Sequence, residues 1–296
     1  MAKSPAHKFG QIIGDLLEVA VERILIPISN ENNLFLDKKG KRPARKGKKV
    51  AWKDMFGNIH DLDFVLEKDG TSDRIGTPIA FIESAWRRYT KHSRNKAQEI
   101  QGAILPLIDT HKLSCPFVGV VIGGVFTEGA IAQLKSIGFS VLYFSYNSII
   151  KSFETVKIDA AFDEDTPDSA FSKKIKDYSK LNGQQKEKII KKLLELNNDS
   201  VNAFLQDLKD AVQRQVKEIF ILPLHGNQTK LDNVQDAIEY ITQYRNLKKS
   251  ITFVKYEILL KFNNNDRIEA SFQNKETAIS FLKQFDTMNF QLVNKK

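Results

Sequence analysis

Residues 60–98 read HDLDFVLEKDGTSDRIGTPIAFIESAWRRYTKHSRNKAQ, and the rest of the chain is interpreted around them. Two acidic residues lie on candidate strands, Asp63 in His60–Glu67 and Glu83 in Pro78–Trp86. The first segment alternates in polarity, and both are rich in β-branched and aromatic residues, which is typical of strands. A glycine-containing turn separates them. The pattern predicts a hairpin-like pair of strands that carries both carboxylates.

Glu83 sits in mid-strand among apolar residues, where an unpaired carboxylate would be costly. The strand leads directly into a basic stretch and then into a predicted helix, Ser93–His111, with Ser93 as its N-cap. Pro106 predicts a kink or an early end of that helix. Lys96 lies on the same arc as the apolar stripe, so we expect its ammonium either to reach solvent or to point into a site.

Helical spacing of apolar residues predicts an earlier helix over Phe9–Ile26, ended by Pro27. Glu18 lies on its polar face, and a solvated position is the favoured interpretation. Residues 38–49, KKGKRPARKGKK, hold eight Lys or Arg residues and almost nothing apolar, which indicates a mobile loop. This loop either solubilises the protein or contacts phosphates through residues such as Lys46 and Lys48.

After the central stretch, the apolar run Phe117–Gly123, a helix over Thr127–Ile137 and the run Phe139–Tyr146 form a predicted βαβ unit with parallel strands. The acidic segment 162–169 looks like a linker. We therefore expect a core domain over residues 1–161 and a C-terminal α+β region over residues 170–296, which would serve DNA recognition or dimerisation. No repeat of 20–50 residues is evident.

The 296-residue chain carries a net charge of +9 and a pI near 9.3. Such a balance favours acidic partners, nucleic acid first and an anionic membrane second. The single cysteine, Cys115, excludes an internal disulfide framework and a cysteine-based zinc site. No signal peptide or membrane-spanning run is evident, so we expect a cytoplasmic protein without a membrane partner.

Phosphodiester hydrolysis explains why two carboxylates and a basic stretch would occur together. A hard cation neutralises charge on the phosphate and activates water, and Mg²⁺ needs few protein oxygens because it keeps several waters. We therefore predict that Asp63 and Glu83 bind Mg²⁺. A nearby lysine would assist the water. The predicted nucleic-acid contacts are Arg87, Arg88, Lys91, Arg94, Asn95, Lys46 and Lys48, with Tyr89 and His92 as further hydrogen-bonding groups.

This arrangement resembles the PD-(D/E)XK nuclease superfamily, restriction-endonuclease-like proteins in particular, over roughly residues 8–150. The resemblance implies an α/β fold with an αβββαβ core, here with a first core strand near Val50–Met55 and acids on the second and third strands. Those acids would be Asp63 and Glu83, with Asp61 as an alternative first ligand and Glu18 as an auxiliary acid from the first helix.

The chain departs from the family at Ala85, where the family has its lysine, two residues after the second acid. Lys96 or Lys91 would supply it. The leading hypothesis is a Mg²⁺-dependent type II restriction endonuclease acting on double-stranded DNA, with a possible homodimer on a palindromic site. The alternative is a nucleic-acid-binding protein without catalysis, which Ala85 favours. The third hypothesis is a protein–protein adaptor whose basic loop is incidental.

Overall fold

The computed structural model describes residues 4–89, 93–223, 227–244 and 255–289, and the chain divides into two compact units, Met1–Val212 and Gln213–Lys296. This division differs from the boundary expected within 162–169. Phe171, Ile190 and Leu208 follow that segment and are buried in the same apolar cluster as Phe9. The residues between the acidic segment and Val212 therefore belong to the first unit, although their composition differs from that of the preceding residues.

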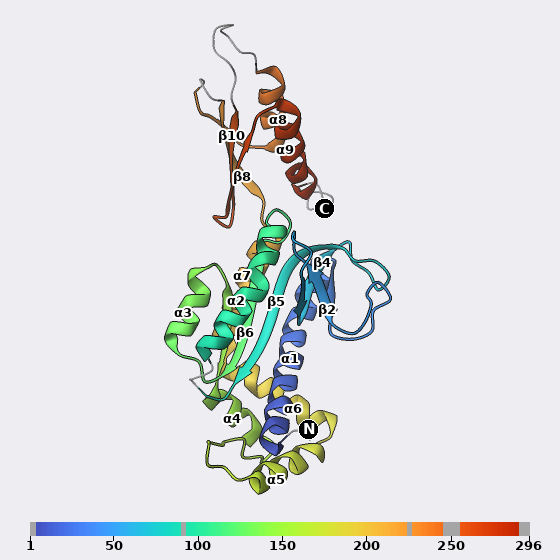
Figure 1. Ribbon diagram of the computed structural model, residues 1–296, viewed down its shortest axis with the longest axis vertical. Helices are drawn as coiled ribbons and strands as arrows, with labels where there is room; N and C mark the ends of the chain where they lie inside the picture. The colour runs from blue at the N-terminus through green and yellow to red at the C-terminus, as the bar shows by residue number, and fades with distance from the viewer. Residues whose placement is uncertain (1–3, 90–92, 224–226, 245–254, 290–296) are drawn as a thin grey trace. The chain divides into compact units, whose positions relative to one another are not determined.

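The first unit is mixed α/β, and Figure 1 shows its elements. In chain order they are α1 (Pro5–Glu31), β1 (Leu34–Lys38), β2 (Val50–Lys53), β3 (Ile59–Leu62), β4 (Phe64–Lys68), β5 (Thr77–Arg87), α2 (Ser93–Thr110), β6 (Phe117–Gly124), α3 (Glu128–Ser136), β7 (Ser140–Ser145), α4 (Tyr146–Glu154), α5 (Asp168–Ser179), α6 (Gly183–Leu196) and α7 (Asn198–Val212).

A five-stranded mixed sheet in the order β1-β4-β5-β6-β7 is the centre of this unit. The first three of these strands are antiparallel, whereas β5, β6 and β7 are parallel. The predicted βαβ unit is thus confirmed. The expected first core strand over Val50–Met55 is wrong, because Leu34–Lys38 takes that place in the sheet and β2 pairs only with β3 in a separate two-stranded ribbon.

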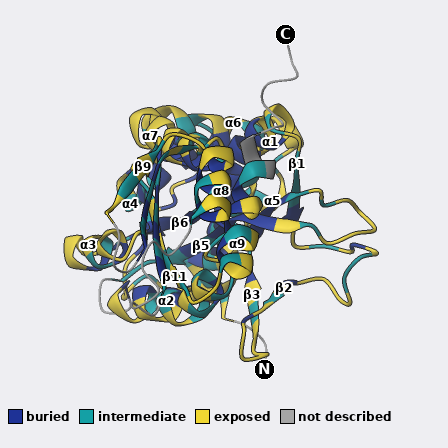
Figure 2. Ribbon diagram, turned by 90° about the horizontal axis from the view of Figure 1, so that it is seen from above, coloured by how far each residue is buried: buried dark blue, intermediate teal, exposed yellow. Residues whose placement is uncertain are grey.

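Two apolar clusters cover the two faces of the sheet. On one face α1 packs with Phe64 and Ile82, and on the other α2 packs with Val65 and Phe81. Strand alternation produces this division, since consecutive side chains point to opposite faces. All eight residues of β6 are buried because helices lie on both faces. Figure 2 shows the exposed outer faces of the helices in yellow.

Helix α1 continues past the proline at which it was predicted to stop, and α2 has the extent predicted for it, without an early end at its internal proline. Helix α1 runs through Pro27 to Glu31, and α2 runs through Pro106 to Thr110. A proline removes one backbone hydrogen bond, but Leu25 and Ile28 are buried on either side of Pro27 and outweigh that loss. Local propensity was overridden here by tertiary packing.

The predicted strand His60–Glu67 is broken at Asp63, which separates β3 from β4. Leu62 packs in the cluster with α2, whereas Phe64 packs in the cluster with α1. In one unbroken strand, Leu62 and Phe64 would lie on the same face, because side chains two residues apart point the same way. The break turns the chain from the ribbon into the main sheet and leaves Asp63 at the joint.

The second unit is α+β, as expected. Its elements are β8 (Val216–Pro223), β9 (Thr229–Leu231), α8 (Val234–Gln243), β10 (Tyr256–Phe262), β11 (Arg267–Phe272) and α9 (Lys275–Asn289). The strands form one sheet in the order β11-β10-β8-β9, and α8 packs against α9. A hairpin around Asn264 joins β10 to β11.

This second unit contains a repeat that the sequence analysis missed. Strands β8 and β9 followed by α8 have the same order as β10 and β11 followed by α9. Residues 218–222, EIFIL, match residues 257–261, EILLK. In the sheet Phe220 lies opposite Leu259, the third residue of each run, so a pseudo-two-fold axis relates the two hairpins.

The helices of the repeat match as well. Asn233 and Asn274 each accept a hydrogen bond from the backbone N–H three residues later, and the residues four positions after each, Ala237 and Ala278, are both buried. Identities between the two halves are sparse: the strands share the Glu-Ile pair that opens each run, and the helices share the capping asparagine and the buried alanine. The repeat became recognisable once the strand register was known.

Candidate active site

The structure brings Asp63 and Glu83 together. Phe64 pairs with Ile82 in the β4–β5 register, so the next position places Asp63 opposite Glu83. A backbone hydrogen bond from Asp63 reaches the Glu83 carboxylate. The Asp63 carboxylate in turn accepts hydrogen bonds from the backbone N–H of Ser84 at 2.7 Å and from its hydroxyl at 2.8 Å. The two acids are therefore held side by side at the joint between the ribbon and the main sheet.

Electrostatics at this pair favour a proton or another cation. The pKa of Glu83 is raised to about 8, chiefly by burial and next by the negative charge of Asp63, whereas the charge of Lys96 and the hydrogen bond from the Asp63 backbone act in the opposite direction. Positive charge supplied by the protein thus fails to offset burial and the neighbouring carboxylate. A group with this environment is typical of functional sites as well as of some buried ion-pair networks.

Glu18 belongs to the same site. Burial raises the pKa of Glu18, and the charge of Asp63 adds to this effect, so the two carboxylates interact. The interpretation of Glu18 as a solvated surface residue is corrected, because its side chain is half-buried and lines a pocket. Its neighbour Glu22, on the same helix, pairs with Lys38 from the basic run.

Lys96 reaches the site from the first turns of α2. Its side chain is 11% exposed, and its Nζ lies 2.7 Å from an oxygen of Glu99, which is itself well exposed. Arg87 at the end of β5 approaches the other oxygen of Glu99 at 3.7 Å. Glu99 therefore holds two cations at the edge of the acid pair. Of the two lysines considered for the family's lysine, Lys91 lies outside the described residues.

A pocket of about 430 Å³ opens beside these residues. One wall is the N-terminal half of α1, including Gly10, Gly14 and Glu18, and the other is the end of β5 from Ser84 onward. Lys96 completes the lining. Glu18 and Lys96 thus line one pocket, and Ser84, which donates hydrogen bonds to the Asp63 carboxylate, forms part of its wall.

Several residues predicted to contact nucleic acid lie elsewhere or are already engaged. Arg88 donates from Nε to the carbonyl oxygen of Phe162 at 2.6 Å and stacks over the ring of Tyr146 at 4.0 Å. It therefore connects the end of β5 to α4 and to the segment that follows α4. Lys46 and Lys48 are exposed on the basic loop, apart from the pocket lining. Two further residues, Arg94 and Asn95, are exposed at the start of α2. His92 lies outside the described residues.

Asp61, the alternative first ligand, is exposed and pairs with Lys49. The side chain therefore points to the outside of the ribbon, and the break at Asp63 explains why the two aspartates do not share a face. Of the two candidates, only Asp63 interacts with Glu83.

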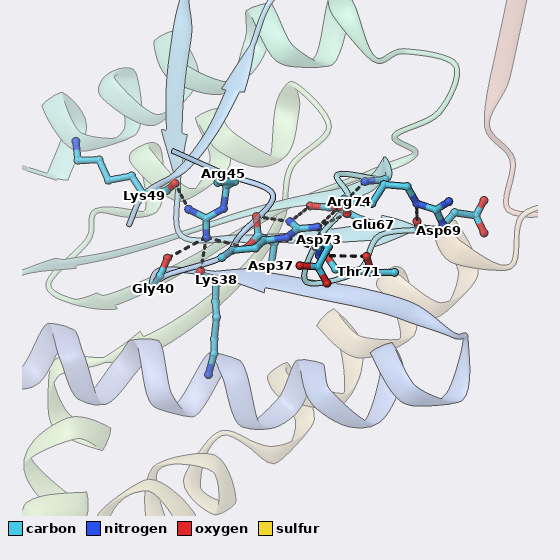
Figure 3. A network of polar contacts seen from close by, with 12 residues as sticks. Asp37, Lys38, Gly40, Arg45, Lys49, Glu67, Asp69, Thr71, Asp73 and Arg74 are labelled. Atoms are coloured by element: carbon cyan, nitrogen blue, oxygen red, sulfur yellow. Dashed lines mark hydrogen bonds and ion pairs between the residues drawn. The ribbon is translucent and has the colours of Figure 1, made fainter. Parts of the chain in front are cut away.

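The basic run 38–49, which was expected to be a mobile loop, is attached to the main sheet by two of its arginines. Figure 3 shows the polar network that it enters. Arg42 is buried and forms hydrogen bonds to both oxygens of Glu67 at 2.6 and 2.9 Å, and it pairs with Asp37 at 2.8 Å. Arg45 approaches the other oxygen of Asp37 at 2.9 Å. Two of the eight basic residues thus anchor the loop to β1 and β4, and charge alone gave no sign of it.

Sequence reasoning missed Ser84 and Glu99. Ser84 follows the predicted acid directly, but serine is common in strands and nothing in the pattern marks it as a partner of Asp63. Glu99 lies three residues after Lys96, a spacing that predicts an ion pair on a helix and that could have identified it.

The raised pKa of Glu83 predicts how stability depends on pH without divalent cations. The folded-state value of about 8 exceeds the ordinary 4.5, so folding favours the protonated carboxyl. This contribution is fully present below pH 4.5 and is lost as pH rises through 8. In EDTA, urea unfolding at pH 6 and pH 9 should therefore show a smaller loss of stability for Glu83→Gln than for the wild type. Equal losses in the two proteins would contradict the assignment.

Comparisons with known proteins leave the family open. No protein-family model matches the chain, and no curated protein matches it. A solved structure of a protein of unknown function, AF1548, is 13% identical, covers 64% of this chain and 98% of its own, and has a TM-score of 0.30. Among the described residues, no helix has both the length and the apolar character needed to cross a bilayer. No group of three or more His, Cys, Asp or Glu side chains suited to a metal ion occurs in the same ranges.

Proposed function

We propose that this protein is a Mg²⁺-dependent endodeoxyribonuclease of the type II restriction class, similar to the PD-(D/E)XK nucleases. The observation that carries the proposal is the placement of Asp63 opposite Glu83 beside a pocket that Lys96 lines. The order α1, β1, β4, β5, α2, β6 is compatible with the αβββαβ core of that superfamily. Asp63 directly precedes β4 and Glu83 lies within β5, and the proposal takes these two strands as the second and third of that core.

Asp63 and Glu83 fit a hard divalent cation as a donor set. They are adjacent, half-buried carboxylates, and the high pKa of Glu83 indicates that positive charge is in deficit there. Two carboxylates suffice because Mg²⁺ keeps several waters of its own. When bound, Mg²⁺ would neutralise charge on the phosphate and lower the pKa of a coordinated water. Ser84 would keep the Asp63 carboxylate oriented through its two hydrogen bonds.

The remaining residues would act on the substrate directly. Lys96 would leave its ion pair with Glu99 and contact the phosphate of the substrate. There it would stabilise the negative charge that develops in the transition state. Glu18 would be the auxiliary carboxylate of the site and would act as a general base that accepts a proton from the attacking water. Arg87 would hold a flanking phosphate. The substrate would be double-stranded DNA, and a palindromic site would favour a homodimer with two-fold symmetry.

The direct test is cleavage of supercoiled plasmid and of a pooled set of genomic DNA fragments with Mg²⁺ or with EDTA. We expect discrete products in Mg²⁺ and none in EDTA. Uncut DNA in Mg²⁺ and in Mn²⁺, at protein concentrations that shift the DNA fully in a gel, would overturn the nuclease and leave a DNA-binding protein. That second candidate is favoured by Ala85, which stands where the family's lysine is expected.

Lys96→Gln should lower the rate of cleavage by about 100-fold or more, because removing one preorganised donor from a charged transition state costs about 10²–10³ in rate. Binding to DNA should weaken far less. Arg94→Gln is a matched control, since Arg94 is an exposed cation two residues earlier on the same helix. Single-turnover rates and gel-shift affinities separate the two effects. Equal rate losses in both variants would assign Lys96 a general electrostatic role only.

A further inference from the structure

The pocket beside the acid pair has more room than a metal ion and its waters require. Its volume of about 430 Å³ lies within the range of sites for small organic ligands. It adjoins Glu18 and Lys96 but extends away from them along α1 as far as His7. The catalytic roles given to the acids and to the lysine leave this part of the pocket without a use.

Two glycines keep the α1 wall of the pocket bare. Gly10 and Gly14 are four residues apart and therefore share one face of the helix. A Cβ on Gly14 would meet no atom within 4 Å, and one on Gly10 would lie an ordinary 3.6 Å from Nε1 of Trp86. Glycine destabilises a helix interior relative to alanine. Since the packing of the protein does not require glycine at either position, the open space points to a ligand.

The chemistry of the walls changes along the pocket. The bare helix face and Trp86 give flat apolar surface, and Trp86 is held in place by the main apolar cluster and by Tyr146 at a ring distance of 6.3 Å. Arg87 and Lys96 give positive charge at the end next to the acid pair. At the outer rim Gln11 is exposed and offers both a hydrogen-bond donor and an acceptor.

We propose that this pocket binds one unstacked nucleotide of the DNA strand, next to the phosphate that is cleaved; the inference rests on the proposed nuclease function and adds a subsite to it. The base lies on the Gly10–Gly14 face, its edge meets Gln11, and its phosphate meets Arg87 and Lys96. A flat ring with one anionic end matches this order of surfaces. Proteins commonly bind unstacked bases on aromatic and apolar surfaces beside a cationic groove.

Trp86 provides a direct probe for this subsite. The chain has two tryptophans, and Trp52 packs against Phe81 and His111 in the other cluster, so Trp52→Phe leaves Trp86 as the sole indole reporter. In EDTA, where hydrolysis cannot occur, titration with deoxynucleoside 5′-monophosphates and with the oligonucleotide dT4 should change Trp86 emission in a saturable way. Inorganic phosphate at the same concentration should produce no such change.

Gly14→Leu should fill the pocket and weaken binding of dT4 at least 10-fold, and Gly14→Ala should weaken it a few-fold. Gly102→Leu is the matched control, because Gly102 is an exposed helical glycine on α2 whose added Cβ would also meet nothing within 4 Å. It should bind like the parent. Both leucine variants should unfold at or above the parental temperature, which shows that lost binding is not lost folding.

The outcomes separate this inference from the nuclease proposal. Metal-dependent cleavage without a saturable Trp86 response, or with unchanged binding in Gly14→Leu, overturns the nucleotide subsite and leaves the nuclease. A saturable response that Gly14→Leu abolishes, in a protein that cuts no DNA, supports the subsite and overturns the nuclease. If Gly14→Leu does not fold, Gly14→Ala decides, and binding equal to that of the parent overturns the subsite.

Discussion

Glu83→Gln is expected to lower Mg²⁺-dependent DNA cleavage by more than about 100-fold, with the fold preserved. Changing a group behind a metal ligand already costs about 10–100-fold in metal affinity or activity, so losing a ligand itself should exceed that range. Glutamine keeps the size of the side chain and removes the negative charge that a cation requires. The amide can still accept the hydrogen bond from the Asp63 backbone.

Thermal unfolding gives a measure of metal binding that is independent of cleavage. A ligand that binds only the folded state raises its unfolding temperature. Saturating Mg²⁺ or Ca²⁺ should therefore stabilise the wild type, and Glu83→Gln and Asp63→Asn should lose this response. Glu154→Gln, at an exposed carboxylate on α4, serves as the control and should behave like the wild type. If the cation still raises the unfolding temperature of both site variants, Asp63 and Glu83 are not the metal ligands.

The central stretch was predictable because its signals are local and strong. Pro78–Trp86 is apolar on both sides of its polar Glu83-Ser84 pair, and the strand over Thr77–Arg87 is observed there. The continuous apolar run at Phe117 could only fit a strand covered on both faces, and β6 is buried throughout. The antiparallel pairing of β4 with β5 places Asp63 opposite Glu83.

Features that depend on distant partners were less accessible. The break at Asp63 changes which face Leu62 occupies, and no residue type there signals a break. Two arginines of the basic run are buried because Asp37 and Glu67 on the adjacent strands β1 and β4 receive them. A charge run looks the same in sequence whether its partners are waters or buried carboxylates.

The role of individual glycines could not be predicted from the sequence. Gly14 and Gly102 are both helical and both open to space, yet only Gly14 faces the pocket. Their sequence neighbourhoods do not distinguish them. The direction in which a helix face points is set by what packs on the rest of the helix, and here Phe9 and Ile13 are buried in the core beside the face that carries Gly10 and Gly14.

Arg42→Met should destabilise the protein by about 3–5 kcal/mol, the usual cost of removing one partner from a buried ion pair. Glu67 is fully buried, and its two carboxylate oxygens would lose their hydrogen bonds to the guanidinium. The same guanidinium also donates to the carbonyl oxygens of Thr71 and Arg74, so the turn between β4 and β5 would lose its anchor.

Equilibrium unfolding in urea measures the loss of stability expected for Arg42→Met, and Lys46→Met, at an exposed cation of the same loop, is the control. Because the desolvation of an unpaired Glu67 carboxylate is the cause, the double variant Arg42→Met, Glu67→Leu should recover part of the lost stability. A double variant less stable than Arg42→Met would show that the hydrogen bonds to the turn, rather than the buried charge, dominate.

The network lies toward the Glu67 end of β4, whereas Asp63 precedes the first residue of that strand. The Arg42→Met variant should therefore retain any metal response below its unfolding temperature. Stability and site geometry would then be separable properties of one strand.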